Sequence, residues 1–385
     1  MPRKRPGCLA RLALFTVALL LSLVLAEVAV RIFANEVMPL SFGPRYMYQS
    51  DPELGITLTP GFEGQFALHN EFDVSISINS RGYRDREFGP KPGGVTRIIS
   101  LSDSMGFGYG VTSEDSYPKQ LETKLNENLD QARFEVLNAG APARGIQHMI
   151  RVLERSAWFK PDVVIASFFF VNDLDDMHNF PVHTVRGGMV FPRPIAKVID
   201  DNSWLAFSIN YSKLSLLAYR AWFNWLRRMR GDSTRLGGAV APPGRLWGTE
   251  ALLTGADPDS APGGDNLWAE FQTQLKILDD KTQAMGARLV LFTIPQEYLT
   301  RDEAWDELKR SGAVTDKHDR DLPGRKLTKI CADIGVTFYD TVPDFRAKPP
   351  TETRFFPINK HFSPAGNAFV GEILAQFLRS KEFVR

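Results

Sequence analysis

Apolar and polar positions follow two different patterns along the chain. Between residues 50 and 90 the sequence is rich in turns, and apolar residues alternate loosely with polar ones. Four apolar residues of this segment share one parity, which predicts a half-buried strand: Phe72, Val74, Ile76 and Ile78. From Arg97 onward, short apolar runs alternate with stripes of apolar residues at helical spacing. This alternation predicts a three-layer α/β/α domain built on a parallel sheet.

The second pattern predicts individual elements. Short apolar runs predict strands at 98–101, 134–140, 162–170, 288–294 and 336–339. The run at 162–170 is apolar throughout, which is typical of a central parallel strand covered on both faces. Helical stripes predict helices at 117–125, 146–157, 267–285 and 322–333. A last helix should begin at Ser363 and Pro364, because serine is a good cap and proline suits the first helical position.

The N-terminal segment has the composition of an export or anchor signal. A basic cluster and Arg11 precede an uncharged run at 12–26, and this order leaves the positive end in the cytoplasm. Apolar character resumes after Glu27 and continues to Phe33, nearly the ~20 residues needed to span a bilayer. We therefore expect residues 1–33 to form a cytoplasmic tail and signal anchor, with the remainder periplasmic or extracellular. Cleavage after Ala26 is the alternative.

The alternation of strands and helices stops between residues 177 and 266, which predicts an insertion. It contains a predicted aromatic helix at 203–230, followed by a Gly/Pro-rich stretch at 231–264. One face of the predicted helix is apolar and aromatic: Trp204, Phe207, Tyr211 and Leu214. Such a face most often packs on its own domain as a lid, but a basic amphipathic helix with tryptophans also lies on membrane surfaces. We accordingly divide the chain into the anchor, a β-rich segment at 40–95, and an α/β domain at 96–385 that carries the insertion.

Composition narrows the classes of function. The chain has 46 basic and 45 acidic residues, and this balance argues against a nucleic-acid partner. Only two cysteines occur, and Cys8 lies in the anchor segment, so the folded part should hold one thiol, Cys331, and no internal disulfide. His178 and His183 follow two aspartates, but their spacing matches no zinc pattern, so neither a metal nor another cofactor is expected.

Candidate chemistry gathers at the ends of the predicted strands. The stretch "IISLSDSMGFGYGV" ends the first strand in Ser104 and opens into glycines. The stretch "LNAGAPARG" at 137–145 follows the second strand, and Asn172 follows the third. His361 lies in the loop before the last helix. The carboxyl ends of parallel strands open on one edge of a sheet, so these groups should meet there. A serine, amide donors, an asparagine and a histidine can together form an acyl-transfer site.

With these motifs the chain resembles the SGNH, or GDSL-type, hydrolase family across residues 97–385. The resemblance implies a flavodoxin-like five-stranded sheet, with Ser104 as the nucleophile and His361 as the base. It also implies an oxyanion hole formed by the amides of Ser104 and Ala143 and by the side chain of Asn172. The segment "INSRGYRD" before the first strand is similar to exported, membrane-anchored members.

The sequence departs from the family pattern at four positions. Ser102, Ala143 and Phe170 stand where the family has glycine, and Asn359 replaces the aspartate two residues before the histidine. An amide oxygen can accept the imidazole N–H but adds no charge, and the reversed amide would select the wrong tautomer. We expect Asn359 to accept through its oxygen, and Asn359→Asp then to keep or increase activity. Asp340, a backbone carbonyl or a Ser-His dyad are the alternatives.

Three functions are consistent with these residues. The first is a membrane-anchored ester hydrolase that acts through a Ser104 acyl-enzyme. The second is an O-acyltransferase that modifies an envelope or secreted polysaccharide. For these two enzymes the expected partner is an ester or an acylated glycan substrate. The third is a catalytically weak binding or assembly protein on the same fold.

Overall fold

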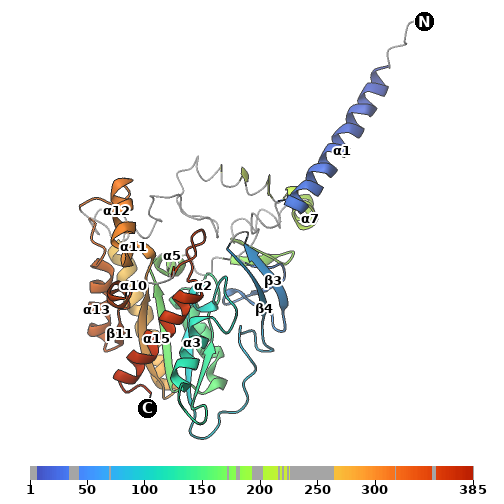
Figure 1. Ribbon diagram of the computed structural model, residues 1–385. Coiled ribbons are helices and arrows are strands. Elements are labelled where there is room, and N and C mark those ends of the chain that lie inside the picture. The colour runs from blue at the N-terminus through green and yellow to red at the C-terminus, as the bar shows by residue number, and fades with distance from the viewer. Residues whose placement is uncertain are drawn as a thin grey trace.

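A long apolar helix, two β-hairpins and a three-layer α/β/α domain follow one another along the chain (Figure 1). The structure is a computed structural model of the 385-residue chain. It describes residues 7–33, 43–68, 71–170, 173–178, 183–192, 203–215, 217–218, 221–222, 225, 264–316, 318–348 and 353–384.

The central sheet contains five parallel strands in the order β11-β10-β7-β5-β6. They are β5 (Thr96–Leu101), β6 (Phe134–Asn138), β7 (Val163–Phe169), β10 (Arg288–Ile294) and β11 (Thr337–Tyr339). Counted in chain order, this is the 2-1-3-4-5 arrangement of flavodoxin-like folds. All five predicted strands are confirmed. The strand order reverses at β5, whose neighbours are β6 on one side and β7 on the other, and ligands of such sheets bind outside the carboxyl ends at this point.

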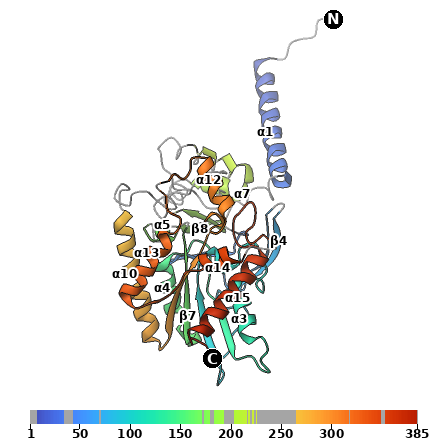
Figure 2. The same cartoon turned by 60° about the vertical axis from the view of Figure 1, so that its left-hand side comes forward.

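Helices cover both faces of the sheet, as Figure 2 shows. They are α3 (Tyr117–Asn126), α4 (Ile146–Arg155), α10 (Gly264–Ala284), α13 (Leu322–Ile334) and α15 (Pro364–Ser380). Side chains of α4, α10 and α13 share one core, and those of α3 and α15 share the other. Successive strand residues point to opposite faces, so Ile99 lies in the first core and Ile98 in the second. The helices predicted at 117–125, 146–157, 267–285 and 322–333 and the last helix are confirmed.

Burial explains why the apolar runs form strands. Every residue of β7 is buried, because β5 and β10 flank this strand and helices cover both of its faces. Each fully buried Val, Ile or Phe side chain contributes about 1.5–3 kcal/mol relative to an exposed one. The remaining short elements are α2 (Ser104–Phe107), η1 (Ala157–Phe159), α5 (Asp173–His178), β8 (His183–Arg186), β9 (Met189–Pro192), α11 (Glu297–Thr300), α12 (Asp302–Arg310) and α14 (Val342–Ala347).

The segment before the sheet forms two antiparallel hairpins that lie against the α/β domain. The first pairs β1 (Tyr48–Asp51) with β2 (Gly55–Leu58), and the second pairs β3 (Glu63–Leu68) with β4 (Phe72–Ser77). Ile76 and Ile78 are buried as their parity predicts. The core of the hairpins also includes Phe107 and Tyr109, which follow β5. The hairpins therefore pack beside the edge of the sheet that carries Ser104.

The N-terminal helix α1 (Cys8–Phe33) has no buried residue. It is the one helix, among the residues that the structure describes, that is long and apolar enough to cross a membrane. Most of the insertion at 177–266 lies outside the described residues. Its helix α7 (Ser203–Tyr211) ends well before residue 230, the predicted end of the aromatic helix, because Ser212 is not helical. Helix α7 leaves Trp204, Phe207 and Tyr211 exposed at 79%, 57% and 69%. The expectation that this face packs on its own domain as a lid is therefore wrong for these three side chains.

Candidate active site

Ser104 lies at the point where the strand order reverses. The chain leaves β5 through the buried Ser102 and Asp103 and starts helix α2 at Ser104, which is half-buried. Asp103 caps this helix, because its Oδ1 accepts the N–H of Met105 at 2.9 Å. Burial raises the pKa of the Asp103 carboxyl. The turn from strand to helix thus presents a serine hydroxyl at the ligand-binding edge of the sheet.

Ser102, the first departure from the family pattern, is accommodated within this turn. Its hydroxyl lies 2.7 Å from the Ser167 hydroxyl and accepts the N–H of Gly106 at 3.1 Å. A Cβ at position 106 would lie only 2.4 Å from the Ser102 Cβ. The absence of a side chain on Gly106 therefore leaves the space that the serine occupies.

His361 reaches Ser104 from the loop before α15. Its Nε2 lies 2.8 Å from Ser104 Oγ. An isolated bridge between Phe355 and Phe362 closes this loop, and the Phe356 N–H donates to the His361 carbonyl at 2.8 Å. The loop holds the imidazole at hydrogen-bond distance from a hydroxyl that is 257 positions away in sequence.

Asn359 contacts the other side of the imidazole. Its Oδ1 lies 3.0 Å from Nδ1 of His361 and accepts the backbone N–H of the same residue at 2.8 Å. Lys360, between the two, has a φ of 62°, in the left-handed region, and this tight turn folds the Asn359 side chain back onto His361. Asp340, the alternative acceptor, is instead engaged by the Thr293 hydroxyl at 3.0 Å and the Val342 N–H at 3.1 Å.

Glu71, from the hairpin between β3 and β4, fixes the orientation of the Asn359 amide. Asn359 Nδ2 donates to Glu71 Oε2 at 2.6 Å, and the backbone N–H groups of Asn359 and Ile358 also donate to this carboxylate. A reversed amide would place its oxygen against the Glu71 carboxylate and its NH₂ against the backbone N–H of His361. The amide oxygen therefore faces the imidazole, which carries its proton on Nδ1 and directs the Nε2 lone pair at Ser104.

Glu71 could not be identified from the sequence. The residue lies 288 positions before Asn359, and an acidic side chain in a hairpin is most often a solvated surface group. Neither its type nor its spacing to any other candidate predicts the contact.

Tyr109 covers the face of the imidazole. The rings of Tyr109 and His361 stack with centroids 4.3 Å apart and planes at 18°. The flanking Gly108 and Gly110 have φ values of 79° and 87°, which a chiral residue adopts only at a cost. Burial lowers the pKa of His361 to about 4. The imidazole is therefore neutral near pH 7, as a general base requires.

Two backbone amides are available for an oxyanion. No hydrogen bond from the N–H of Ser104 or Ala143 occurs within the described part of the chain. Gly140 brings the loop of Ala143 against α2, because a Cβ there would lie 2.6 Å from the Phe107 nitrogen. Ala143 has a φ of 62°, so it keeps the left-handed backbone that glycine favours. Asn172, the third expected donor, lies outside the described residues.

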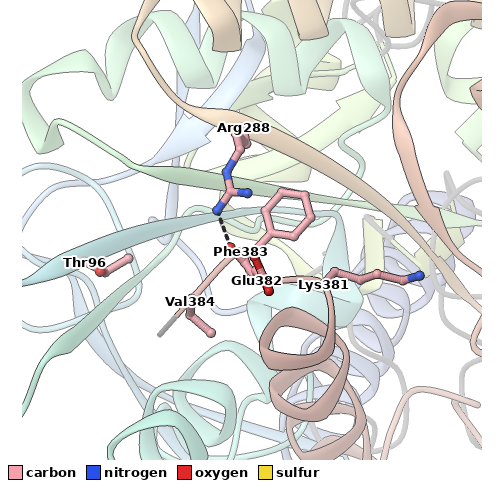
Figure 3. A pocket seen from close by; sticks show the side chains of 6 residues that line it. All are labelled: Thr96, Arg288, Lys381, Glu382, Phe383 and Val384. Carbon is pink, nitrogen blue, oxygen red and sulfur yellow. Dashed lines mark hydrogen bonds between the residues drawn. The ribbon is translucent and has the colours of Figure 1, made fainter.

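Neither Phe170 nor a separate pocket adds a group to this site. Phe170, another departure from the family pattern, is buried beside Phe168, with ring centroids 5.5 Å apart. A separate pocket, shown in Figure 3, lies between the starts of β5 and β10 and the C-terminal residues. Thr96 and Arg288 begin these strands, so this pocket is at the opposite edge of the sheet, about 20 Å from Ser104 for a six-residue strand.

No protein-family model matches the chain, and no curated protein matches it in sequence. Structural neighbours do exist among esterases and GDSL-type proteins. A protein of the G-D-S-L family from Desulfitobacterium hafniense DCB-2 has 13% identity and a TM-score of 0.36, over 73% of this chain and 98% of that one. An acetylxylan esterase from Geobacillus stearothermophilus has 16% identity and a TM-score of 0.38, over 77% and 99%. The esterase EstA from a Pseudoalteromonas species has 13% identity and a TM-score of 0.35, over 74% and 98%.

Proposed function

We propose that this protein is a serine ester hydrolase of the SGNH/GDSL type. The observation that carries the proposal is the continuous hydrogen-bonded series Ser104, His361, Asn359 and Glu71 at the reversal point of the sheet. A hydroxyl bonded to a neutral imidazole whose second nitrogen has a fixed acceptor is the arrangement that activates a serine.

The reaction follows from this geometry. His361 Nε2 takes the Ser104 proton as Oγ bonds to the ester carbonyl carbon. The carbonyl oxygen becomes negative and accepts hydrogen bonds from the N–H groups of Ser104 and Ala143. The imidazolium, stabilised by the Asn359 oxygen, then donates its proton to the alcohol oxygen as the C–O bond breaks. A water molecule releases the acyl group by the same steps, again with His361 as base.

The test compares alanine variants of the full-length protein in detergent, with an aryl acetate as substrate. Ser104→Ala and His361→Ala should each lose activity by several orders of magnitude, since each removes a reacting group. Ser113→Ala is the matched control, because this serine follows α2 but bonds to the Arg84 carbonyl and not to His361. Turnover by Ser104→Ala equal to that of the control would refute the proposal.

We also propose that α1 remains as a membrane anchor and that the catalytic domain is periplasmic or extracellular. The basic flank at its start and its continuation through Glu27 to Phe33 support anchoring. Cell fractionation and sequencing of the mature N-terminus test this point. A soluble product that begins at Glu27 would contradict it.

A further inference from the structure

The end of α1 is bonded to the insertion. Glu27 accepts hydrogen bonds from the Ser212 hydroxyl at 2.8 Å and from the backbone N–H groups of Lys213 and Leu214 at 3.0 and 2.9 Å. Arg31 donates to the Tyr211 carbonyl at 2.8 Å and to Glu27 at 2.7 Å. The one acidic residue within α1 therefore caps the turn that follows α7 and holds this turn against the end of the anchor.

Helix α7 presents an aromatic face to the outside. Its nine residues include no charged side chain, and Trp204, Phe207 and Tyr211 lie on one face at a spacing of three and four. The ring centroids of Trp204 and Phe207 are 6.3 Å apart, and those of Phe207 and Tyr211 are 4.8 Å apart. These rings contact one another yet stay mostly exposed. A cluster of exposed large aromatic side chains marks an interaction surface.

The position of α7 along α1 indicates what covers this face. Arg11 and Glu27 bound the uncharged part of α1, and the 16-residue step between them spans about 24 Å at 1.5 Å per residue. A bilayer has a hydrocarbon core of about 30 Å, only about 6 Å more than this step, and the long Arg11 side chain can reach outward to the headgroups. Glu27 and the turn bonded to it therefore fall near the boundary between hydrocarbon and headgroups. In Figure 1, α7 lies beside the end of α1 that is nearer to the α/β domain. Tryptophan and tyrosine concentrate at this depth in membrane proteins.

We propose that Trp204, Phe207 and Tyr211 insert into the headgroup region of the lipid bilayer that α1 crosses. The proposal rests on the anchoring proposed above and adds a second point of attachment. Two attachments set the orientation of the domain, which a single helix leaves free. The C terminus lies at the end of the domain far from α1 in both views (Figures 1 and 2), so the opposite edge of the sheet, which carries Ser104, faces the bilayer.

Spin labels on the full chain in phosphatidylcholine vesicles test the proposal. With Cys8→Ser as the background, Cys331 stays unlabelled because it is buried. Single cysteines are placed at Phe207, at Leu19 in α1, and at Lys329 on α13, whose side chain is 77% exposed. Leu19 reports on the anchor and Lys329 on the aqueous phase. Circular dichroism and a cooperative thermal unfolding transition check that each labelled protein is folded.

The expected result is that the Phe207 label, like the Leu19 label, is accessible to oxygen and protected from a soluble nickel chelate, whereas the Lys329 label shows the reverse. A label at Trp204 should behave like the one at Phe207 and guards against a local effect of one substitution. If the Phe207 label is as accessible to nickel as the Lys329 label while the Leu19 label lies in lipid, the proposed insertion of α7 into the bilayer is refuted. The proposed membrane anchor then still holds. Protection from both reagents would show a protein partner, and would refute it as well. Nickel accessibility at Leu19 would refute the anchor itself.

Discussion

Replacing Glu71 by alanine should lower kcat/KM for an activated ester about 10- to 150-fold. The Glu71 carboxylate receives the Asn359 NH₂ at 2.6 Å and so holds the amide oxygen toward His361. A hydrogen bond to a charged group contributes about 1.5–3 kcal/mol, and each 1.36 kcal/mol of barrier is about tenfold in rate. Complete reversal of the amide would select the wrong imidazole tautomer, an error that costs about 10⁴-fold in a serine protease, and this value is the upper limit.

Initial rates near neutral pH on one aryl acetate measure the effect, and thermal unfolding checks the fold. Asp73→Ala is the matched control, because it removes an exposed carboxylate two positions along the same hairpin. Glu71→Gln should retain more activity than Glu71→Ala, since its carbonyl oxygen can still accept from Asn359. Wild-type kcat/KM in Glu71→Ala, with an unchanged melting temperature, would refute the orienting role.

The same contact reverses the expectation for Asn359→Asp. From the sequence alone, a carboxylate at 359 should keep or increase activity. In the structure it would stand at hydrogen-bond distance from the Glu71 carboxylate, and two such charges repel. We now expect Asn359→Asp to be less active than the wild type, and the double variant Glu71→Gln with Asn359→Asp to recover activity. Equal rates for the single and double variants would show that the two side chains do not interact.

Further predictions concern pH and the backbone around the nucleophile. Burial lowers the pKa of His361 to about 4, and only the neutral imidazole accepts a proton. We therefore expect kcat/KM to stay level as the pH falls and to drop only near pH 4. A decline of kcat/KM centred near pH 6.5 would contradict the buried geometry. Gly106→Ala should lower the melting temperature, because the new Cβ would lie 2.4 Å from the Ser102 Cβ. The double variant with Ser102→Gly should recover part of the lost melting temperature. Equal melting temperatures of the single and double variants would contradict this. Ala143→Gly should raise the free energy of unfolding by about 1 kcal/mol, because the left-handed φ at position 143 strains alanine. Activity should stay unchanged, because the hydrogen-bond donor is the backbone N–H. A lower free energy of unfolding in the variant would contradict this.

The main elements of the fold could be predicted because their causes are local. The run at 288–294 is mostly apolar after Arg288 and forms β10 over the same residues. The serine-proline pair at 363–364 starts α15 as predicted. Period and caps are properties of neighbouring residues, so a single sequence contains them. The meeting of Ser104 and His361 could also be predicted, because the parallel sheet itself brings strand ends and the loop before α15 to one edge.

The features that the sequence left open depend on packing between distant segments. Asn359 could orient the imidazole correctly or incorrectly, and only Glu71, brought in by the β3–β4 hairpin, decides between the two. Ser102 looked like a loss of a required glycine, yet Gly106 opposite it supplies the missing space. The aromatic face of α7 has the spacing of a face that packs on its own domain, but its three rings are exposed. The turn after α7 bonds to α1, a contact between segments about 185 positions apart that no local pattern predicts.

The central claim is that Ser104 is a nucleophile activated by His361. Incubation of the full-length protein with a fluorophosphonate, followed by mass spectrometry of its peptides, tests this claim most directly. We predict stoichiometric modification of Ser104, much slower modification in His361→Ala, and none at this peptide in Ser104→Ala. An unmodified Ser104 in the folded wild-type protein, or equal labelling rates in wild type and His361→Ala, would contradict the account.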